Sequence, residues 1–187
     1  MSLTEGQKFP ENVEFTYIPI QLDDLALINP LKCDTSTQLK VDELLTKLST
    51  TDTPNVLIVS VPGAFTPTCT EVHIPQYLQN LSKLTEAKIG AIIVLAFNDP
   101  FVVNAWGKVL IKEYVSNESG KALPQVIFAS DGGFSAGNDL AADRGGVLRN
   151  KRYATVIDAK DKTVKYVGVE VERGVHYSGL DAVLAKL

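Results

Sequence analysis

The sequence predicts a single α/β domain over residues 1–187, in which a central mixed sheet is flanked by helices. Two observations carry this prediction. Strand-like and helix-like segments alternate through the first two thirds of the chain, which is typical of parallel strands joined by helices. Two strand-like segments then follow one another at 153–158 and 163–169 across a short turn, which is typical of an antiparallel hairpin. Because both patterns occur in one chain, the sheet should be mixed.

The chain begins with a strand-like segment and a helical stripe. Residues 14–20 predict a strand, and Pro19 places that strand at an edge of the sheet, because proline cannot donate to a central ladder. A helical stripe that ends in a polar loop at 49–54 follows, formed by Leu39, Leu44, Leu45 and Leu48.

The middle of the chain contains two apolar strands, each followed by a helix. The run at 56–61 predicts the first strand, and residues 70–87 keep a helical face that Pro75 should kink. The continuous β-branched run at 89–97 predicts a strand covered on both faces. After a turn, a helix is expected at about 100–115.

The last third of the chain contains several short predicted elements. Residues 126–128 predict a short strand, and the glycine-rich segment 131–146 should hold one short helix. This segment lacks the spacing of a phosphate-binding loop. A closing helix is expected at about 178–186.

Composition excludes several function classes. The net charge is −4 and no stripe of Lys and Arg is present, which argues against nucleic-acid binding. The apolar runs are too short to span a bilayer, and no secretion signal is recognisable, so we expect a reducing compartment. The glycosylation patterns at Asn80 and Asn117 are then chance matches, the second in a surface loop. Two cysteines make no disulfide scaffold, so each should be catalytic, redox-active or buried.

The most informative segment is Pro62-Gly63-Ala64-Phe65-Thr66-Pro67-Thr68-Cys69, which joins the strand at 56–61 to a helical segment. A cysteine at such a junction lies beside backbone N–H groups that have no partner inside the helix. These groups and the helix dipole favour a thiolate, which is the nucleophilic form. Cys69 is therefore a candidate reactive cysteine, and the restricting prolines Pro62 and Pro67 shield it from water.

A helix N-terminus alone does not ionise a thiol. Making an ordinary thiol mostly ionised at neutral pH needs about 2.7 kcal/mol, whereas a helix N-terminus supplies about 0.3–1 kcal/mol. A cation should therefore lie against the sulfur, and an arginine suits this place because its fork can contact both a sulfur and a bound oxygen. The candidates are Arg144, Arg149, Arg152 and Arg173, with several lysines; Arg152 begins a strand, which is a rigid support.

These residues resemble the peroxiredoxin family. Pro62, Thr66 and Cys69 fit its signature Pro-x-x-x-Thr-x-x-Cys. The full octet with His73-Ile74-Pro75-x-Tyr77 is similar to the atypical two-cysteine branch, which includes fungal alkyl hydroperoxide reductases and peroxisomal membrane-associated peroxiredoxins. Lys151-Arg152-Tyr153-Ala154 stands where the family carries its catalytic arginine, and the order of elements agrees over residues 5–187.

The resemblance implies a thioredoxin-like fold and a thiol peroxidase that needs neither a metal nor an organic cofactor. Cys69 would be the peroxidatic cysteine that attacks a hydroperoxide, with Pro62, Thr66 and Arg152 around it. Phe65 and His73 would stand at the edge of the substrate pocket. The remaining cysteine, Cys33, lies in a polar segment typical of an exposed loop. By similarity to some fungal members, we expect Cys33 to resolve the sulfenic acid as a disulfide with Cys69, between the subunits of a homodimer. Thioredoxin or a related dithiol would recycle it.

Other interpretations remain open. Cys69 alone could be a small buried residue and Cys33 an incidental thiol, while His73, one turn after Cys69, could form a Cys–His dyad. The same fold could also serve as a redox sensor or holdase with little turnover; a cysteine hydrolase is a weaker alternative. The spacing of Cys33, Cys69, His73 and His176 does not fit a zinc site. Ala185-Lys186-Leu187 resembles the peroxisomal address Ser-Lys-Leu, so the peroxisomal matrix is expected slightly ahead of the cytoplasm.

Overall fold

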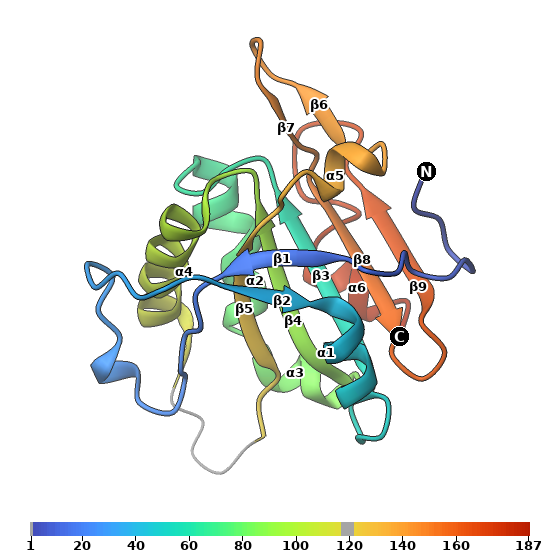
Figure 1. The fold of residues 1–187 in the computed structure, drawn as a ribbon, viewed down its shortest axis with the longest axis horizontal. Coiled ribbons are helices and arrows are strands. Elements are labelled where there is room, and N and C mark those ends of the chain that lie inside the picture. Colours follow the sequence, from blue (N-terminus) through green and yellow to red (C-terminus); the bar gives the residue numbers. More distant parts are fainter. Residues whose placement is uncertain (1, 117–121) are drawn as a thin grey trace.

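The structure is a computed structural model that describes residues 2–116 and 122–187. Its centre is a seven-stranded sheet in the order β2-β1-β5-β4-β3-β8-β9 (Figure 1). These strands are β1 (Glu14–Tyr17), β2 (Thr37–Lys40), β3 (Asn55–Val61), β4 (Ile89–Ala96), β5 (Gln125–Ser130), β8 (Tyr153–Asp158) and β9 (Thr163–Val169). The neighbours β3, β4 and β5 are parallel, and every other pair in this sheet is antiparallel. The predicted mixed sheet is thus confirmed.

Helices cover both faces of the sheet. They are α1 (Val41–Leu48), α2 (Ile74–Leu78), α3 (Leu81–Glu86), α4 (Pro100–Tyr114), α5 (Phe134–Gly137) and α6 (Leu180–Leu184). One apolar cluster joins the sheet to α2, α3, α4 and α6, and it includes Cys69. A second cluster joins the other face to α1, which lies in front of the sheet in Figure 1, with α6 behind it.

The parallel strands form the buried centre of the molecule. Every residue of β3 is buried, and all of β4 except Gly90 is buried, as the β-branched run at 89–97 predicted. The helix α4 packs directly on β5. The Trp106 ring meets Phe128 edge-on at 5.7 Å, and both side chains are fully buried. A Cβ on Gly107 would lie 2.5 Å from Phe128, so glycine is what lets the helix approach this strand. The helix begins where Asp99 accepts hydrogen bonds from the N–H groups of Phe101 and Val102.

Two predictions near the N-terminus were wrong. The strand β1 is not at an edge, because β2 and β5 pair with its two sides; Pro19 lies beyond the end of β1 and interrupts no ladder. Leu39 belongs to β2 rather than to the helical stripe, and α1 begins at Val41. Leu39 still lies in the same apolar cluster as the helix, which is why its spacing resembled a helical face.

The predicted helix over 70–87 is divided. A π-helical turn, Cys69–His73, leads into α2, and the chain breaks at 79–80 before α3. Pro75 stands in the first turn of α2, directly after the π-helical turn, where the missing N–H group of a proline is tolerated. The Ile74 N–H group bonds to the Cys69 carbonyl, five residues back.

The glycine-rich segment holds more structure than predicted. Besides the short helix α5, it contributes β6 (Ala141–Asp143), which pairs with β7 (Leu148–Asn150) in a separate two-stranded sheet. This hairpin stands at the top of Figure 1, above the end of β3 that leads to Cys69. The closing helix α6 is shorter than expected, and the pattern at Asn117 lies outside the described residues. Among the helices that the structure describes, none has the length and apolar character needed to cross a membrane.

Candidate active site

The loop after β3 holds Cys69 in the first turn of a helix. Hydrogen bonds fix this loop: the Asn98 amide oxygen accepts from the Ala64 N–H group at 2.8 Å, and the Thr66 hydroxyl donates to the Gly63 carbonyl at 2.9 Å. Phe65 takes a left-handed conformation with φ 56°, which is uncommon for a bulky side chain. Helical hydrogen bonding begins when the Thr70 N–H group bonds to the Thr66 carbonyl. The predicted strand-to-helix junction is therefore present.

A guanidinium lies against the sulfur of Cys69. The Arg152 Nη2 atom donates to Cys69 Sγ at 3.4 Å, and Cys69 is 1% exposed. The sheet register explains this contact. Tyr153 at the start of β8 pairs with Ser60 of β3, so Arg152 comes level with the end of β3, where the loop to Cys69 starts. Of the four arginines considered from the sequence, Arg152 is the one that the described structure brings to the sulfur.

His73 supports this arginine from behind. Its Nδ1 atom accepts a hydrogen bond from Arg152 Nη1 at 3.0 Å, and its Nε2–H donates to the Ser178 carbonyl at 2.8 Å. The Tyr77 hydroxyl donates to the same carbonyl at 2.6 Å. Burial, together with the charge of Arg152, lowers the pKa of His73 from 6.5 to about 4, against the opposing effect of Ser178. His73 is thus a neutral acceptor at physiological pH, and it faces Arg152 rather than Cys69.

A cavity of about 520 Å³ opens beside this arrangement. Its lining comprises Pro62, Thr68, Arg144, Arg152 and the segment 170–174, and Cys69 reaches it through its contact with Arg152 rather than as a lining residue. Two of the expected pocket residues are placed elsewhere: His73 is fully buried, while Phe65 is 57% exposed, and neither lines this cavity. Thr66 also lies outside the lining, with its hydroxyl turned to Gly63 rather than to the sulfur.

Glu170 organises the far wall of the cavity, and the sequence analysis did not identify it. Its Oε1 atom accepts hydrogen bonds from the N–H groups of His176, Tyr177 and Ser178 and from the Ser178 hydroxyl, at 2.7–2.8 Å. Burial opposes ionisation of Glu170, but these hydrogen bonds outweigh it and lower the pKa of the carboxyl group. The Glu170 N–H group also bonds to the Arg152 carbonyl. An acid after a predicted strand was the only sequence signal for this role.

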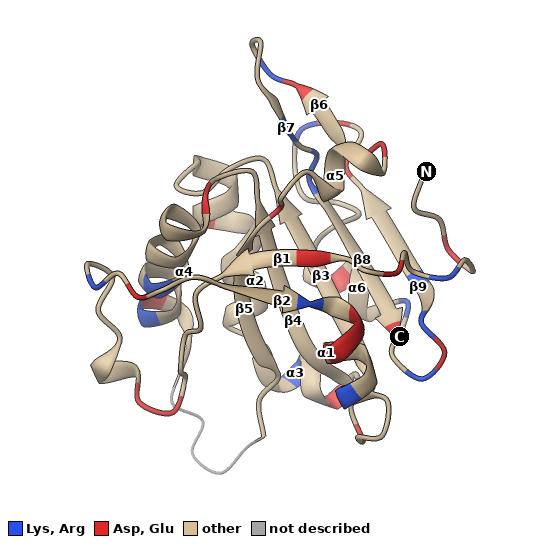
Figure 2. Ribbon diagram, in the orientation of Figure 1, with Lys and Arg blue, Asp and Glu red and all other residues tan. Residues whose placement is uncertain are grey.

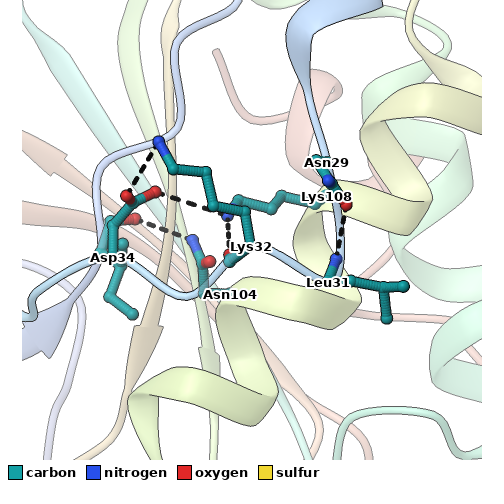
Figure 3. A network of polar contacts seen from close by, with 7 residues as sticks. Asn29, Leu31, Lys32, Asp34, Asn104 and Lys108 are labelled. Carbon is teal, nitrogen blue, oxygen red and sulfur yellow. Dashed lines mark hydrogen bonds and ion pairs between the residues drawn. The ribbon is translucent and has the colours of Figure 1, made fainter.

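The second cysteine stands on a loop that is tied to α4. Cys33 is exposed, whereas Lys108 of α4 is nearly buried beneath the loop. Figure 3 shows the Lys108 ammonium group donating to the Lys32 carbonyl at 2.8 Å, with Asp34 at 3.9 Å. Lys112 bonds to the Ile28 carbonyl at 3.1 Å. The residues on both sides of Cys33 are therefore held, while the thiol itself faces solvent.

The same helix reaches the other cysteine. The Trp106 indole N–H group donates to the hydroxyl of Thr70, the residue after Cys69, at 3.2 Å. The helix α4 thus supports the loop of Cys33 and the helical turn of Cys69. Within the described ranges, no group of three or more His, Cys, Asp or Glu side chains could hold a metal ion.

Comparison with known proteins identifies the family of this chain. The model of the family described as Redoxin matches residues 4–184. The chain belongs to the redoxin family. A protein of Lipomyces kononenkoae whose name assigns it to the peroxisomal peroxiredoxins is 40% identical, covering 96% of this chain and 98% of its own. Peroxiredoxin AHP1 of Chaetomium thermophilum is 34% identical, covering 99% of this chain and 95% of its own.

Solved structures agree with the sequence relatives. The crystal structure of reduced Prx3 of Vibrio vulnificus in complex with H2O2 is 27% identical, with a TM-score of 0.73, and covers 98% of each chain. The predicted thioredoxin-like fold and the predicted peroxiredoxin family are therefore confirmed, and the protein is a peroxidase enzyme. The roles of the individual site residues stay predictions.

Proposed function

We propose that this peroxiredoxin reduces hydrogen peroxide and alkyl hydroperoxides at Cys69. The observation that carries the proposal is the contact of 3.4 Å between the Arg152 guanidinium and Cys69 Sγ, beside a cavity that Arg152 also lines. A cation at this distance supplies the stabilisation of a thiolate that a helix N-terminus cannot supply alone. The H2O2 bound by the Vibrio vulnificus relative supports the same substrate class.

The first step oxidises the sulfur by two electrons. The Cys69 thiolate attacks one peroxide oxygen, an S–O bond forms, and the O–O bond breaks. Cys69 becomes a sulfenic acid, and the departing oxygen takes a proton and leaves as water or an alcohol. The Arg152 guanidinium donates hydrogen bonds to the oxygens and stabilises the negative charge that grows on the departing one. The expected bond from the peroxide to Thr66 would require the peroxide to pass beyond the cavity lining, because the Thr66 hydroxyl lies outside that lining and donates to Gly63.

His73 and Pro62 prepare the site rather than react. A neutral imidazole that accepts from Arg152 fixes the direction of the guanidinium without competing for the negative charge on sulfur. Pro62 lines the cavity and cannot donate a backbone hydrogen bond into it. We therefore assign His73 as a positioning residue for Arg152, in place of a Cys–His dyad.

We propose that Cys33 of a second subunit resolves the sulfenic acid. The Cys33 thiolate would attack the oxidised sulfur, an S–S bond would form, and water would leave. Exposure of Cys33 on a loop favours this reaction, whereas the burial of Cys69 requires residues 67–73 to open first. The exposed phenylalanines Phe65, Phe97 and Phe101 are consistent with a homodimer. Thioredoxin or a related dithiol would then reduce the disulfide.

Peroxide consumption coupled to thioredoxin, thioredoxin reductase and NADPH tests this mechanism. We expect Cys69→Ser to abolish the reaction. Cys33→Ser should consume one equivalent of peroxide and then stop, and it should form no disulfide-linked dimer on non-reducing gels. Unchanged thioredoxin-dependent turnover in Cys33→Ser would reject the resolving role while leaving the peroxidase assignment intact. Mass spectrometry of the peroxide-treated protein locates the disulfide directly.

A redox sensor or holdase is the alternative from another class. Such a protein would show one stoichiometric oxidation of the wild-type chain and no sustained rate with any dithiol. The contact of Arg152 with Cys69 serves the first oxidation in either case, so sustained turnover with a dithiol is the measurement that separates the two functions.

We further propose that the protein acts in the peroxisomal matrix, with the cytoplasm as the alternative. The name of the Lipomyces kononenkoae relative supports this proposal, as does the likeness of Ala185-Lys186-Leu187 to Ser-Lys-Leu. A fluorescent reporter carrying residues 178–187 should collect in peroxisomes of a fungal cell, and a reporter without the last three residues should not. A diffuse signal from the first reporter would remove the proposal.

A further inference from the structure

The cavity beside Cys69 is larger than hydrogen peroxide requires. A water molecule accounts for about 30 Å³ of the liquid, and hydrogen peroxide is only a little larger. The cavity volume of about 520 Å³ lies instead within the range of about 300–1,000 Å³ typical of small-molecule sites. The excess volume would accept the organic part of a larger hydroperoxide.

Two arginines in the cavity wall have no partner within the chain. Arg144 and Arg173 line the cavity, and neither side chain forms an ion pair or hydrogen bond with another described residue. Arg152, in contrast, is engaged by His73 and Cys69. The cavity therefore has one guanidinium directed at the reacting sulfur and two that are available to a ligand.

Both free arginines are carried by fixed turns. Arg144 stands at the turn of the β6–β7 hairpin, which is closed by the hydrogen bond from its N–H group to the Val147 carbonyl at 2.9 Å. Arg173 stands in the loop after β9, which Glu170 closes through its bonds to residues 176–178. In Figure 2, basic positions lie on this hairpin and on this loop, at the same end of the sheet.

The acidic residues of the cavity do not form ion pairs with these two arginines. The carboxylate of Glu170 is held by four donors within its own loop. Glu172 is exposed and forms no ion pair with Arg144 or Arg173. The three arginines of the lining carry one more formal charge than its two carboxylates, and neither carboxylate is paired with Arg144 or Arg173. Guanidinium groups bind carboxylates through two parallel hydrogen bonds.

We propose that Arg144 and Arg173 bind the carboxylate of an organic hydroperoxide whose peroxide group lies at Cys69. This inference rests on the proposed peroxidase reaction and names the substrate class of the same cavity. The peroxide end would meet Arg152, which joins the cavity lining to Cys69 Sγ, while the hydrocarbon part would lie along Pro62 and Val171 and the carboxylate end would meet the two arginines. Oxidised carboxylic acids would thus be preferred to neutral hydroperoxides of the same shape.

A matched pair of substrates tests the proposal. We expect the wild-type enzyme to reduce 4-hydroperoxy-4-methylpentanoate with a kcat/KM about tenfold above that for its methyl ester, which corresponds to about 1.4 kcal/mol. In the variant Arg144→Gln/Arg173→Gln this ratio should fall to about one, with the kcat/KM for H2O2 unchanged. The variant Lys47→Gln/Lys160→Gln removes the same charge outside the cavity and should keep the wild-type ratio.

A binding measurement gives a second readout that needs no turnover. The product-like 4-hydroxy-4-methylpentanoate should slow alkylation of Cys69 by iodoacetamide in the wild type but not in Arg144→Gln/Arg173→Gln, whereas the neutral tert-amyl alcohol should slow it in neither. If the active wild-type enzyme has an acid-to-ester ratio of one, the carboxylate inference is overturned while the proposed peroxidase reaction stands. The inference is also overturned if the acid-to-ester ratio stays at the wild-type value in Arg144→Gln/Arg173→Gln. It is overturned as well if this variant loses as much kcat/KM with H2O2 as with the acid. A wild-type chain that turns over no hydroperoxide and is not protected by the acid overturns both proposals.

Discussion

Replacing His73 with glutamine should make the stability of this protein less dependent on pH. The His73 imidazole is fully buried, and its unprotonated Nδ1 atom faces the guanidinium of Arg152. A proton added at Nδ1 would remove this hydrogen bond and place two cations side by side. Glutamine does not titrate, yet its amide can still donate toward the Ser178 carbonyl that His73 now contacts.

The magnitude follows from the lowered pKa of His73. In the unfolded chain this group binds a proton below about pH 6.5, whereas in the folded protein it binds one only below about 4. Between these values the unfolded state binds more protons, so stability falls as the pH falls. The slope approaches about 1.4 kcal/mol per pH unit, and the total loss, complete below pH 4, is about 3 kcal/mol.

Urea unfolding of the reduced protein measures this effect. The single tryptophan, Trp106, is fully buried and reports the transition by fluorescence. We expect the free energy of unfolding of the wild type, minus that of His73→Gln, to fall by about 3 kcal/mol between pH 7 and pH 4. Taking the difference cancels the contribution to the pH dependence that comes from the carboxylates present in both proteins. The exposed His176 offers a control, because His176→Gln removes the other histidine without touching Arg152.

Two results would refute this reasoning. Parallel curves for the wild type and His73→Gln would mean that His73 is not held neutral by burial and by Arg152. A wild-type protein that gains stability toward pH 4 relative to the variant would reverse the sign, and His73 would then be a cation paired with an acid.

Two further changes test the site and the packing beneath it. Arg152→Lys should slow alkylation of Cys69 at pH 6.5 about tenfold, because one ammonium group cannot serve both the sulfur and His73. Unchanged alkylation would contradict the role of Arg152, and Arg149→Lys, at an arginine with no hydrogen bond to the sulfur, is the control. Gly107→Ala should destabilise the protein by about 2 kcal/mol in urea unfolding, because its Cβ would lie 2.5 Å from the buried Phe128 ring. Val109→Ala, on the exposed side of the same helix, should change stability by less than about 0.5 kcal/mol, and equal losses would argue against the packing explanation.

Local sequence patterns predicted the elements where a single interaction dominates. The β-branched runs of β3 and β4 lie at the centre of the sheet, and Asp99 caps α4 one residue before its proline. The errors arose where tertiary pairing decides. Whether β1 is an edge strand depends on the strands that pair with it, which are β2 and β5. Pro19 carries no information about this pairing. The short hairpin β6–β7 buries too little apolar surface to leave a pattern.

In the candidate site too, the local sequence predicted some features and tertiary contacts decided the others. The octet ending in Cys69 identified the nucleophile position and the family signature, because a strand, a restricted loop and a helix start are encoded by neighbouring residues. The partners of that sulfur are far away in the chain. Among several arginines, Arg152 was favoured by its place at a strand start and by resemblance, and the register of β8 on β3 is what brings it to Cys69.

The sequence by itself therefore determined the fold class, the family and the position of the candidate reactive thiol, since each rests on local patterns or on a contiguous motif. The tertiary structure alone decided that His73 is a neutral support for Arg152, that Glu170 closes the cavity wall, and that Arg144 and Arg173 share one cavity. The physical reason is that burial, hydrogen-bond direction and unpaired charge are properties of residues brought together by folding. They depend on distances between atoms that the order of residues along the chain does not contain.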